Sequence, residues 1–189
     1  MSGSVFFWSA IALLAFWAVG AYNRLVRLRG AAMQAFARLH VEFALQAELL
    51  ESCLASAAQS FSTSRPAELQ DGASARWAAL SGATVQFRAS LAAAKSLPLD
   101  GDAVAALATA LTVLITAWTR LCDECHDLAG EPMPASVFER WAHLTQQAIT
   151  ARVDFNTTVD TYNAAVQEFP ARALAWLFGF RRARRLCTP

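Results

Sequence analysis

The chain has 189 residues, of which 56% are hydrophobic and 16% are charged, a composition that excludes a disordered protein and fits one domain plus an apolar segment. Its formal net charge is +1, yet residues 30–171 hold 8 basic and 15 acidic side chains, a charge of −7, while the two ends hold the other 8 arginines. Because the body would repel phosphate, this division excludes nucleic acid as a partner and favours a membrane surface at the ends.

Residues 1–23 are predicted to form a transmembrane anchor. They contain no charged side chain and include an apolar run of about the length that spans a bilayer. Arg24, Arg27 and Arg29 follow immediately, and by the positive-inside rule they hold the rest of the chain in the cytoplasm and leave the short N-terminus outside. A cleaved secretory signal and a buried helix of a soluble body are the two alternatives. The side chains expected in lipid are Phe6, Phe7, Trp8, Leu13, Leu14, Phe16 and Trp17.

Residues 24–170 carry four amphipathic stripes with the three- and four-residue steps of an α-helix. Asp102 is predicted to cap the third helix, and Ser136 with Glu139 to form a capping box for the fourth. Short breaks containing proline or glycine separate the stripes and favour antiparallel neighbours. We therefore predict an all-α fold, with an N-terminal transmembrane helix followed by an up-down-up-down antiparallel four-helix bundle with long first and last helices. The stripes cover residues 25–61, 69–94, 102–128 and 136–169.

Residues 171–189 are predicted to form a membrane-proximal tail. An even number of antiparallel helices returns the chain to the end from which it started, so the tail should lie beside the anchor. It joins an apolar, aromatic patch to a cluster of arginines, which is typical of an interfacial anchor on anionic lipid. The alternative is that the patch closes the lower end of the bundle core, and the two are compatible. The residues expected at the lipid surface are Arg24, Arg27, Arg29, Trp176, Phe178, Phe180, Arg181, Arg182, Arg184 and Arg185.

Two blocks of the sequence resemble the LemA family. The first, YNRLVRLR, directly follows the anchor, and the second combines a pattern similar to YNxxVxxYNxxIxxFP with a later Phe-Gly-Phe. The chain departs from the family in starting the second block with phenylalanine and in lacking a Pro-Asn-Leu-Val-like element in the first bundle helix. The resemblance implies a bacterial inner-membrane protein with a cytoplasmic helical bundle, and it brings no agreed catalytic residue and no haem. The residues that carry it, expected to serve packing, are Tyr22, Asn23, Phe155, Asn156, Tyr162, Asn163, Phe169, Pro170 and Gly179.

The second block also has a physical interpretation of its own. Phe155, Tyr162 and Phe169 are seven residues apart and are predicted to form one seam that faces the bundle core. Asn156 and Asn163 lie at the edge of this seam, where an amide can reach a neighbouring helix and set its register. Recognition of a partner is the alternative role. The asparagine of the first block is expected to meet the same layer.

Cys122, Cys125 and His126 form a CxxCH sequence, which is the pattern of a c-type haem attachment site and of a redox dithiol. The motif falls in the middle of a helical stripe, away from the helix N-terminus that would lower a thiol pKa. We therefore interpret the cysteines as small buried hydrophobic residues and expect no cofactor and no metal. The alternative is a metal- or haem-binding redox protein, which would require the bundle to lie outside the cytoplasm.

The sequence contains no nucleophile elbow, phosphate-binding glycine loop or HExxH motif, so we expect no enzymatic activity. The predicted function is a non-catalytic, membrane-anchored scaffold or adaptor that presents an acidic bundle surface to a protein partner and contacts anionic lipid. The pattern leaves the oligomeric state and the partner undetermined. The carboxylates expected on that surface are Glu42, Glu48, Glu51, Asp154, Asp160 and Glu168.

Overall fold

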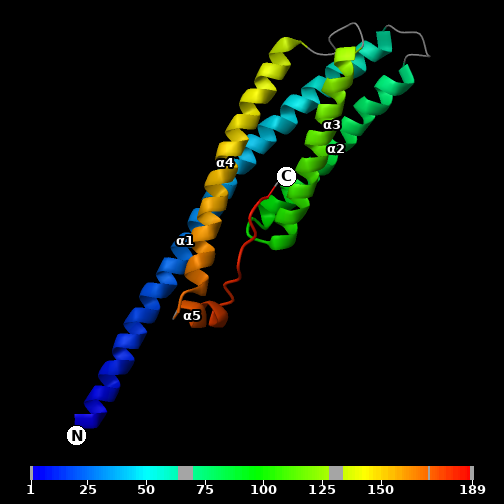
Figure 1. The fold of residues 1–189 in the computed structure, drawn as a ribbon. Helices are drawn as coiled ribbons and strands as arrows, with labels where there is room; N and C mark the ends of the chain where they lie inside the picture. The colour runs from blue at the N-terminus through cyan, green and yellow to red at the C-terminus, as the bar shows by residue number, and fades with distance from the viewer. Residues whose placement is uncertain (1, 64–69, 128–133, 170, 188–189) are drawn as a thin grey trace.

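The computed structural model describes residues 2–63, 70–127, 134–169 and 171–187, and within these ranges the chain is helical without any strand (Figure 1). The prediction of an all-helical fold is therefore confirmed for the described part of the chain. The helices are α1 (Ser2–Thr63), α2 (Gln70–Ser96), α3 (Gly101–Asp127), α4 (Ala135–Gln167) and the short α5 (Ala171–Leu177).

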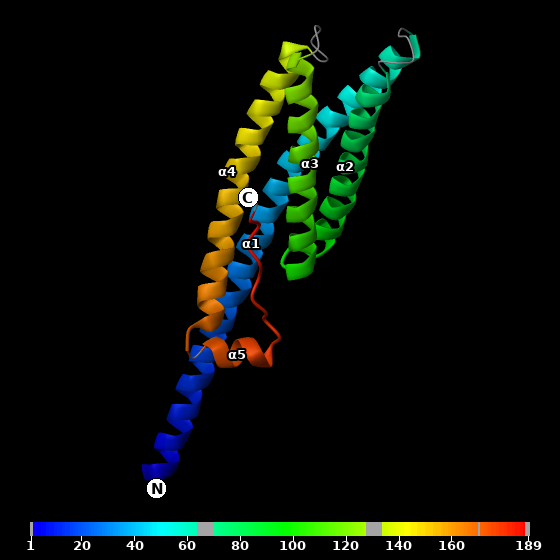
Figure 2. The same cartoon turned by 45° about the vertical axis from the view of Figure 1, so that its right-hand side comes forward.

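The helices α1 to α4 run alternately up and down and pack in the order α4, α1, α2, α3 (Figures 1 and 2). The pairs α1/α4 and α2/α3 have the most extensive contacts, and α1 with α2 joins the two pairs. On the opposite side, no described Cα atom of α3 lies within 8 Å of one in α4. The backbones of α3 and α4 therefore stay apart along this side, which leaves a gap between the two backbones.

Helix α1 has two parts with different surroundings. From Phe6 to Arg24 every side chain is exposed or half-buried, whereas Leu25, one residue later, is 1% exposed and begins the core. Within the described part of the chain, two helices are long and apolar enough to cross a membrane by length and composition, over residues 6–59 and 101–123. The apolar stretch near the N-terminus is wholly unburied, while the stretch in α3 is 39% buried in the body. Only the first of these two stretches thus projects free of the body.

Aromatic side chains join the helices through the core. Phe36 of α1 meets Phe155 of α4 with ring centroids 5.5 Å apart, and Phe43 of α1 meets Phe87 of α2 at the same distance. At the upper end, Trp118 of α3 packs on Phe138 and Trp141 of α4, with centroids 6.0 and 4.8 Å away. These edge-on and tilted contacts are the geometries that aromatic quadrupoles favour. Large side chains therefore link α3 to α4 at the top, although their backbones stay apart.

The helix starts differ from those predicted. The side chain of Asp100, not that of Asp102, caps α3, because its Oδ1 accepts hydrogen bonds from the backbone N–H groups of Asp102 and Ala103 at 3.1 and 2.9 Å. Helix α4 begins after Pro134 without a side-chain cap, so the capping box predicted for Ser136 and Glu139 does not form. The backbone meets part of the need for a cap, because the N–H of Val137 donates to the carbonyl of Pro134 at 2.9 Å.

The expectation that Phe169 continues the core seam is wrong. Phe155 and Tyr162 are buried at 0% and 2% exposure, but Phe169 is 87% exposed. Helix α4 ends at Gln167, and Glu168 takes an extended conformation with φ −63° and ψ 130°. Spacing by sevens places residues on one face only while the helix continues, so the side chain beyond its end leaves the seam.

Gly179 reverses the chain after α5. Its φ is +70°, in the left-handed region, and the next N–H, of Phe180, donates to the carbonyl of Ala175 at 2.8 Å, the six-to-one bond of a Schellman motif. A Gly179→Ala variant is therefore expected to lose about 1–2 kcal/mol of unfolding free energy in urea titrations. Gly82→Ala is the matched control, because Gly82 lies inside α2 with open space around it and should gain roughly 0.5–1 kcal/mol. A neutral Gly179→Ala would contradict this assignment.

Candidate functional site

After Gly179 the chain turns back along the body, and residues 180–187, the C-terminal segment, lie in the gap between α3 and α4 (Figures 1 and 2). Ala183 and Leu186 are buried, Phe180 is half-buried, and the arginines between them are exposed. The segment has no regular secondary structure, and its two buried residues are three positions apart. The C-terminal segment thus occupies part of the side on which the backbones of α3 and α4 stay apart.

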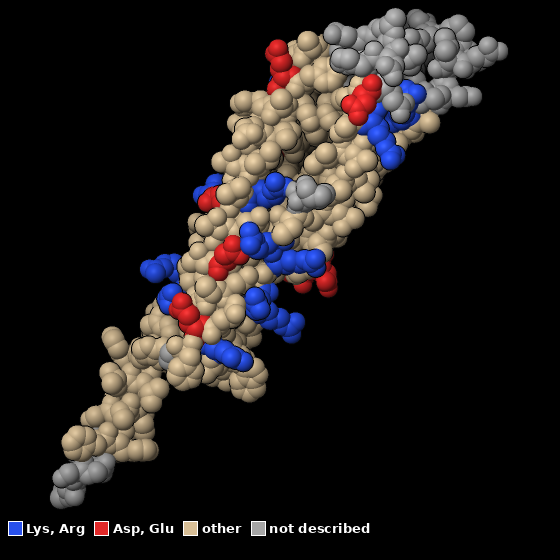
Figure 3. All heavy atoms as spheres, viewed as in Figure 1, with Lys and Arg blue, Asp and Glu red and all other residues tan. Residues whose placement is uncertain are grey.

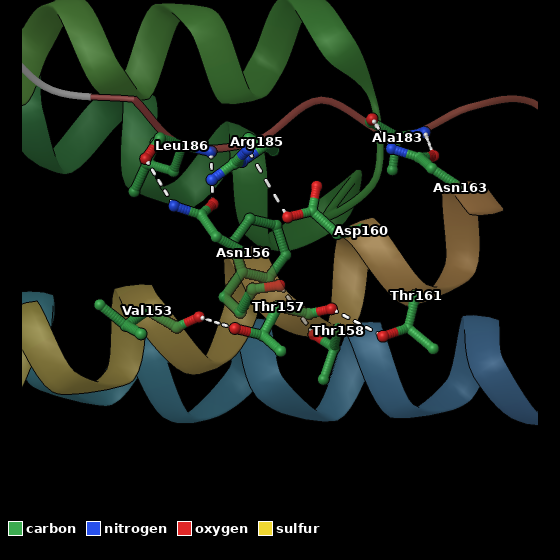
Figure 4. Close-up of polar contacts among 11 residues, drawn as sticks. Val153, Asn156, Thr157, Thr158, Asp160, Thr161, Asn163, Ala183, Arg185 and Leu186 are labelled. Carbon is green, nitrogen blue, oxygen red and sulfur yellow. Dashed lines mark hydrogen bonds and ion pairs between the residues drawn. The ribbon is translucent and has the colours of Figure 1, made fainter.

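Two asparagines of α4 hold the C-terminal segment by its backbone (Figure 4). Asn163 donates its amide N–H to the carbonyl of Ala183 and accepts the N–H of Ala183, both at 2.9 Å. Asn156 does the same with Leu186, at 3.1 and 2.9 Å. Each amide therefore uses a donor and an acceptor on one residue of the segment.

The spacings of the two partners match. Seven residues of an α-helix rise about 10.5 Å, and three residues of an extended chain rise about 9–10 Å. The asparagines at positions 156 and 163 can therefore grip residues three apart without bending either chain. The seven-residue spacing predicted that these two amides would lie half-buried at a helix edge and reach a neighbouring helix. In the structure they bind the extended C-terminal segment instead.

Tyr162 adds a contact at the start of the segment. Its hydroxyl donates to the carbonyl of Arg181 at 2.9 Å, while its ring is 2% exposed. Burial raises the pKa of the Tyr162 phenol, and the positive charge of Arg29 partly opposes this shift. The hydroxyl therefore keeps its proton and remains a donor at neutral pH.

The segment also touches α3. A Cβ atom placed on Gly101, at the start of α3, would lie 3.8 Å from the Cβ of Arg184, and Arg185 pairs with Asp160 of α4 at 3.6 Å. Beside the segment lies an open cavity of about 740 Å³. Its α3 wall consists of Ala105, Ala108, Thr109 and Thr112, its α4 wall of Asp160, Asn163, Ala164 and Gln167, and its third side of Arg182, Ala183, Arg184, Arg185 and Cys187.

The lower end of the body carries exposed aromatic side chains. Trp176 is 85% and Phe178 56% exposed, while the half-buried Phe180 packs against the core. Tyr22 of α1 meets the rings of Phe178 and Phe180 at 4.9 and 5.9 Å. Part of this patch therefore closes the core, and part faces outward at the end from which the N-terminal part of α1 projects.

The arginines expected at the lipid surface are spread along the body. Arg24 pairs with Glu168 at 2.8 Å near α5, whereas Arg185 lies two helical turns higher, beside Asp160. The C-terminal segment therefore climbs away from α5 and does not stay level with it. Asn23 was expected to meet the layer of Asn156 and Asn163, but it is exposed on α1 and does not join that layer. Pro170 lies outside the described residues.

The predicted acidic surface is interrupted by basic side chains. Glu51, Asp154, Asp160 and Glu168 each form an ion pair with an arginine, and acidic and basic groups alternate on the face shown in Figure 3. These pairs are half-exposed, so each is worth at most about 1 kcal/mol. The excess of acidic side chains in the body is thus not gathered into one continuous patch on this face.

The CxxCH sequence is only partly described. Cys122 is half-buried near the end of α3, whereas the side chains of Cys125 and His126 lie outside the described residues. Among the side chains that the structure does place, no three of the types His, Cys, Asp and Glu could together hold a metal ion. The interpretation of this motif stays a prediction.

No protein-family model and no curated protein matches this chain. An amide that bonds both the N–H and the C=O of one residue recognises main chain, whatever the side chain. The arrangement of Asn156, Asn163 and Tyr162 is suited to binding an extended peptide. Sequence spacing had found these residues, but not their partner.

Proposed function

We propose that this chain is a LemA-like, non-catalytic scaffold of the bacterial inner membrane. In this proposal residues 1–23 cross the bilayer once, the short N-terminus lies outside, and the helical body is a four-helix bundle on the cytoplasmic side. The body holds a protein partner at the membrane, and no cofactor takes part. The resemblance of the two sequence blocks to the LemA family supports the assignment.

One observation carries the membrane part of the proposal. The apolar N-terminal part of α1 is exposed, with Phe16 at 81% and Leu13 at 71%, and it projects from the end of the body where Trp176 is also exposed. Apolar side chains of this size and number are not left in water without a reason. A lipid bilayer would cover the projecting helix, and its interface would suit the aromatic rings of α5 beside it.

The orientation is tested with Cys187, which is exposed on the body. In a variant whose other cysteines are replaced by serine, a membrane-impermeant maleimide should label Cys187 only after the cells are permeabilised. A second variant, with cysteine at Ser2 in place of Cys187, should be labelled in intact cells. Labelling of Cys187 from outside would overturn the cytoplasmic placement and restore the haem alternative for Cys122, Cys125 and His126.

The anchor is tested by placing charge in its middle. The double variant Leu13→Arg with Leu14→Arg is expected to move most of the protein from the carbonate-resistant membrane fraction to the soluble fraction, because each arginine costs about 2.5–3.5 kcal/mol at the centre of a membrane helix. The matched control is Val153→Arg, at a 59% exposed position on α4, which should leave the distribution unchanged. An unchanged double variant would show that this stretch does not span the bilayer.

A further inference from the structure

We propose that α5 is a second membrane contact of this chain, an interfacial helix that lies flat in the leaflet from which α1 emerges and prefers anionic lipid. Its lipid-facing side chains, which we call the α5 apolar face, are Trp176, Leu177 and, just after the helix, Phe178. This inference rests on the proposed membrane anchor and deepens it, because it names the lipid class and the second element that holds the body at the bilayer.

Helix α5 turns its small side chains inward and its large apolar ones outward. It packs on α1 and α4, and its buried residues, Ala171 and Ala175, are one turn apart. On the outer side, Trp176 is 85%, Leu177 67% and Phe178 56% exposed. A surface helix in water normally has the opposite arrangement, with its large apolar side chains toward the core. Contiguous exposed patches of this kind mark interaction sites, so the α5 apolar face needs a covering surface.

The position of the α5 apolar face on the body indicates what covers it. The ring of Phe178 meets that of Tyr22 on α1, with centroids 4.9 Å apart, and the core begins three residues later at Leu25. Residues 2–22 of α1 rise about 30 Å, which is the thickness of the hydrocarbon core of a bilayer. The α5 apolar face therefore lies at the level where the proposed span ends, in the interfacial layer that tryptophan and tyrosine favour.

The direction of α5 also suits an interfacial helix. Figure 2 shows its axis running across that of α1, near the point at which α1 leaves the body. A bilayer crossed by α1 would therefore lie along α5, and an interfacial helix buries its apolar face about 5–10 Å deep at the boundary between headgroups and acyl chains. The anchor and α5 would then attach the body at two places, so that it does not swing about a single helix.

The charges at this end favour anionic lipid. The sequence has no acidic residue before Glu42 and none after Glu168. Arg27 lies on α1 about 7.5 Å past the level of Tyr22, Arg172 lies in the first turn of α5, and both are exposed. No described carboxylate pairs with either arginine. An arginine stem can lie along apolar side chains while its guanidinium binds a lipid phosphate, so these two residues are placed to bind headgroups.

The exposed area favours lipid over a second copy of the chain. The three side chains of the α5 apolar face expose roughly 400–500 Å², since a large aromatic side chain has about 150–250 Å² of surface. A stable interface between proteins buries about 800 Å² on each partner. A bilayer has no such requirement, because the anchor already holds the chain beside it and only the local apolar surface has to be transferred from water.

The test uses the full-length protein reconstituted into lipid vesicles and labelled with a nitrobenzoxadiazole fluorophore on one cysteine at a time. The quencher is a phosphatidylcholine that carries a nitroxide on its acyl chain, so quenching reports contact with lipid. The label is placed at Leu177→Cys on the α5 apolar face, at Leu13→Cys in the anchor, or at Val153→Cys, a 59% exposed position on α4 about 21 Å above the end of that helix. The native cysteines are replaced by Cys53→Ala, Cys122→Ser, Cys125→Ser and Cys187→Ser.

In vesicles of phosphatidylcholine with phosphatidylglycerol, the labels at positions 177 and 13 should be quenched and the label at 153 should not. Quenching at 177 should weaken in phosphatidylcholine alone and in 1 M salt, where the Debye length falls to about 3 Å. Arg172→Glu with Trp176→Glu, both at exposed positions, should lower quenching at 177 to the level at 153 while the circular dichroism stays unchanged. Arg140→Glu, exposed near the other end of α4, is the matched control and should leave the quenching as it is.

Quenching at position 13 without quenching at 177 would overturn this inference and leave the membrane anchor intact, whereas absence of quenching at both positions would contradict the proposed function itself. Equal quenching at 177 in neutral and anionic vesicles would overturn the preference for anionic lipid. An inter-chain disulfide between unlabelled Leu177→Cys chains would assign the α5 apolar face to a second copy and overturn the contact with lipid.

Discussion

Replacement of Phe155 by alanine is expected to lower the free energy of unfolding of the helical body by about 3–5 kcal/mol. Phe155 is fully buried, and its ring meets Phe36 edge-on with centroids 5.5 Å apart, so truncation removes both a large apolar surface and an aromatic contact between α1 and α4. The loss is measured from urea unfolding of the detergent-solubilised protein, followed by far-ultraviolet circular dichroism.

Phe169 provides a matched control within the same sequence block. It lies two heptads after Phe155, but it is 87% exposed beyond the end of α4. Phe169→Ala should therefore change the unfolding free energy by less than about 0.5 kcal/mol. Similar losses for the two variants would mean that Phe169 packs in the core, as its spacing alone indicates, and would contradict the end of α4 at Gln167.

The double variant Asn156→Ala with Asn163→Ala is expected to release the C-terminal segment from the body. Each substitution leaves the N–H and C=O of a buried segment residue without their partner, at a cost of about 1–3 kcal/mol per site. The C-terminal segment then spends much of its time away from its site between α3 and α4. Limited trypsin digestion reports this directly, because the segment contains four arginines, at positions 181, 182, 184 and 185.

Cleavage after these arginines should become at least about tenfold faster in the double variant, since 1.4 kcal/mol is a factor of ten in the open population. Mass spectrometry of the shortened chain identifies the cleavage sites. The unfolding midpoint of the helical body should change much less than in Phe155→Ala. Asn23→Ala, an exposed amide on α1, is the control and should leave the rate unchanged. Unaltered cleavage of the double variant would show that the asparagines do not hold the segment.

Much of the fold was predictable because it depends on local spacing. Apolar steps of three and four residues indicated the four long helices, and proline and glycine indicated the breaks between them. Helix ends were less accurate, since a cap is decided by one backbone rotation. Asp100 caps α3 in place of Asp102, and Pro134 precedes α4 where a capping box was expected.

The candidate site shows where local spacing stops being sufficient. Helical periodicity is enough to place Phe155, Tyr162, Asn156 and Asn163 on neighbouring faces of one helix, because 3.6 residues per turn bring positions seven apart together. It does not reveal what the asparagines hold. Their partners lie 20 and 30 residues away, in a segment that has no helical period and that reaches them only after the reversal at Gly179. The segment can reach them because the backbones of α3 and α4 stay apart. The distance between two helices is set by the packing of the whole body, and it cannot be derived from the periodicity of one helix.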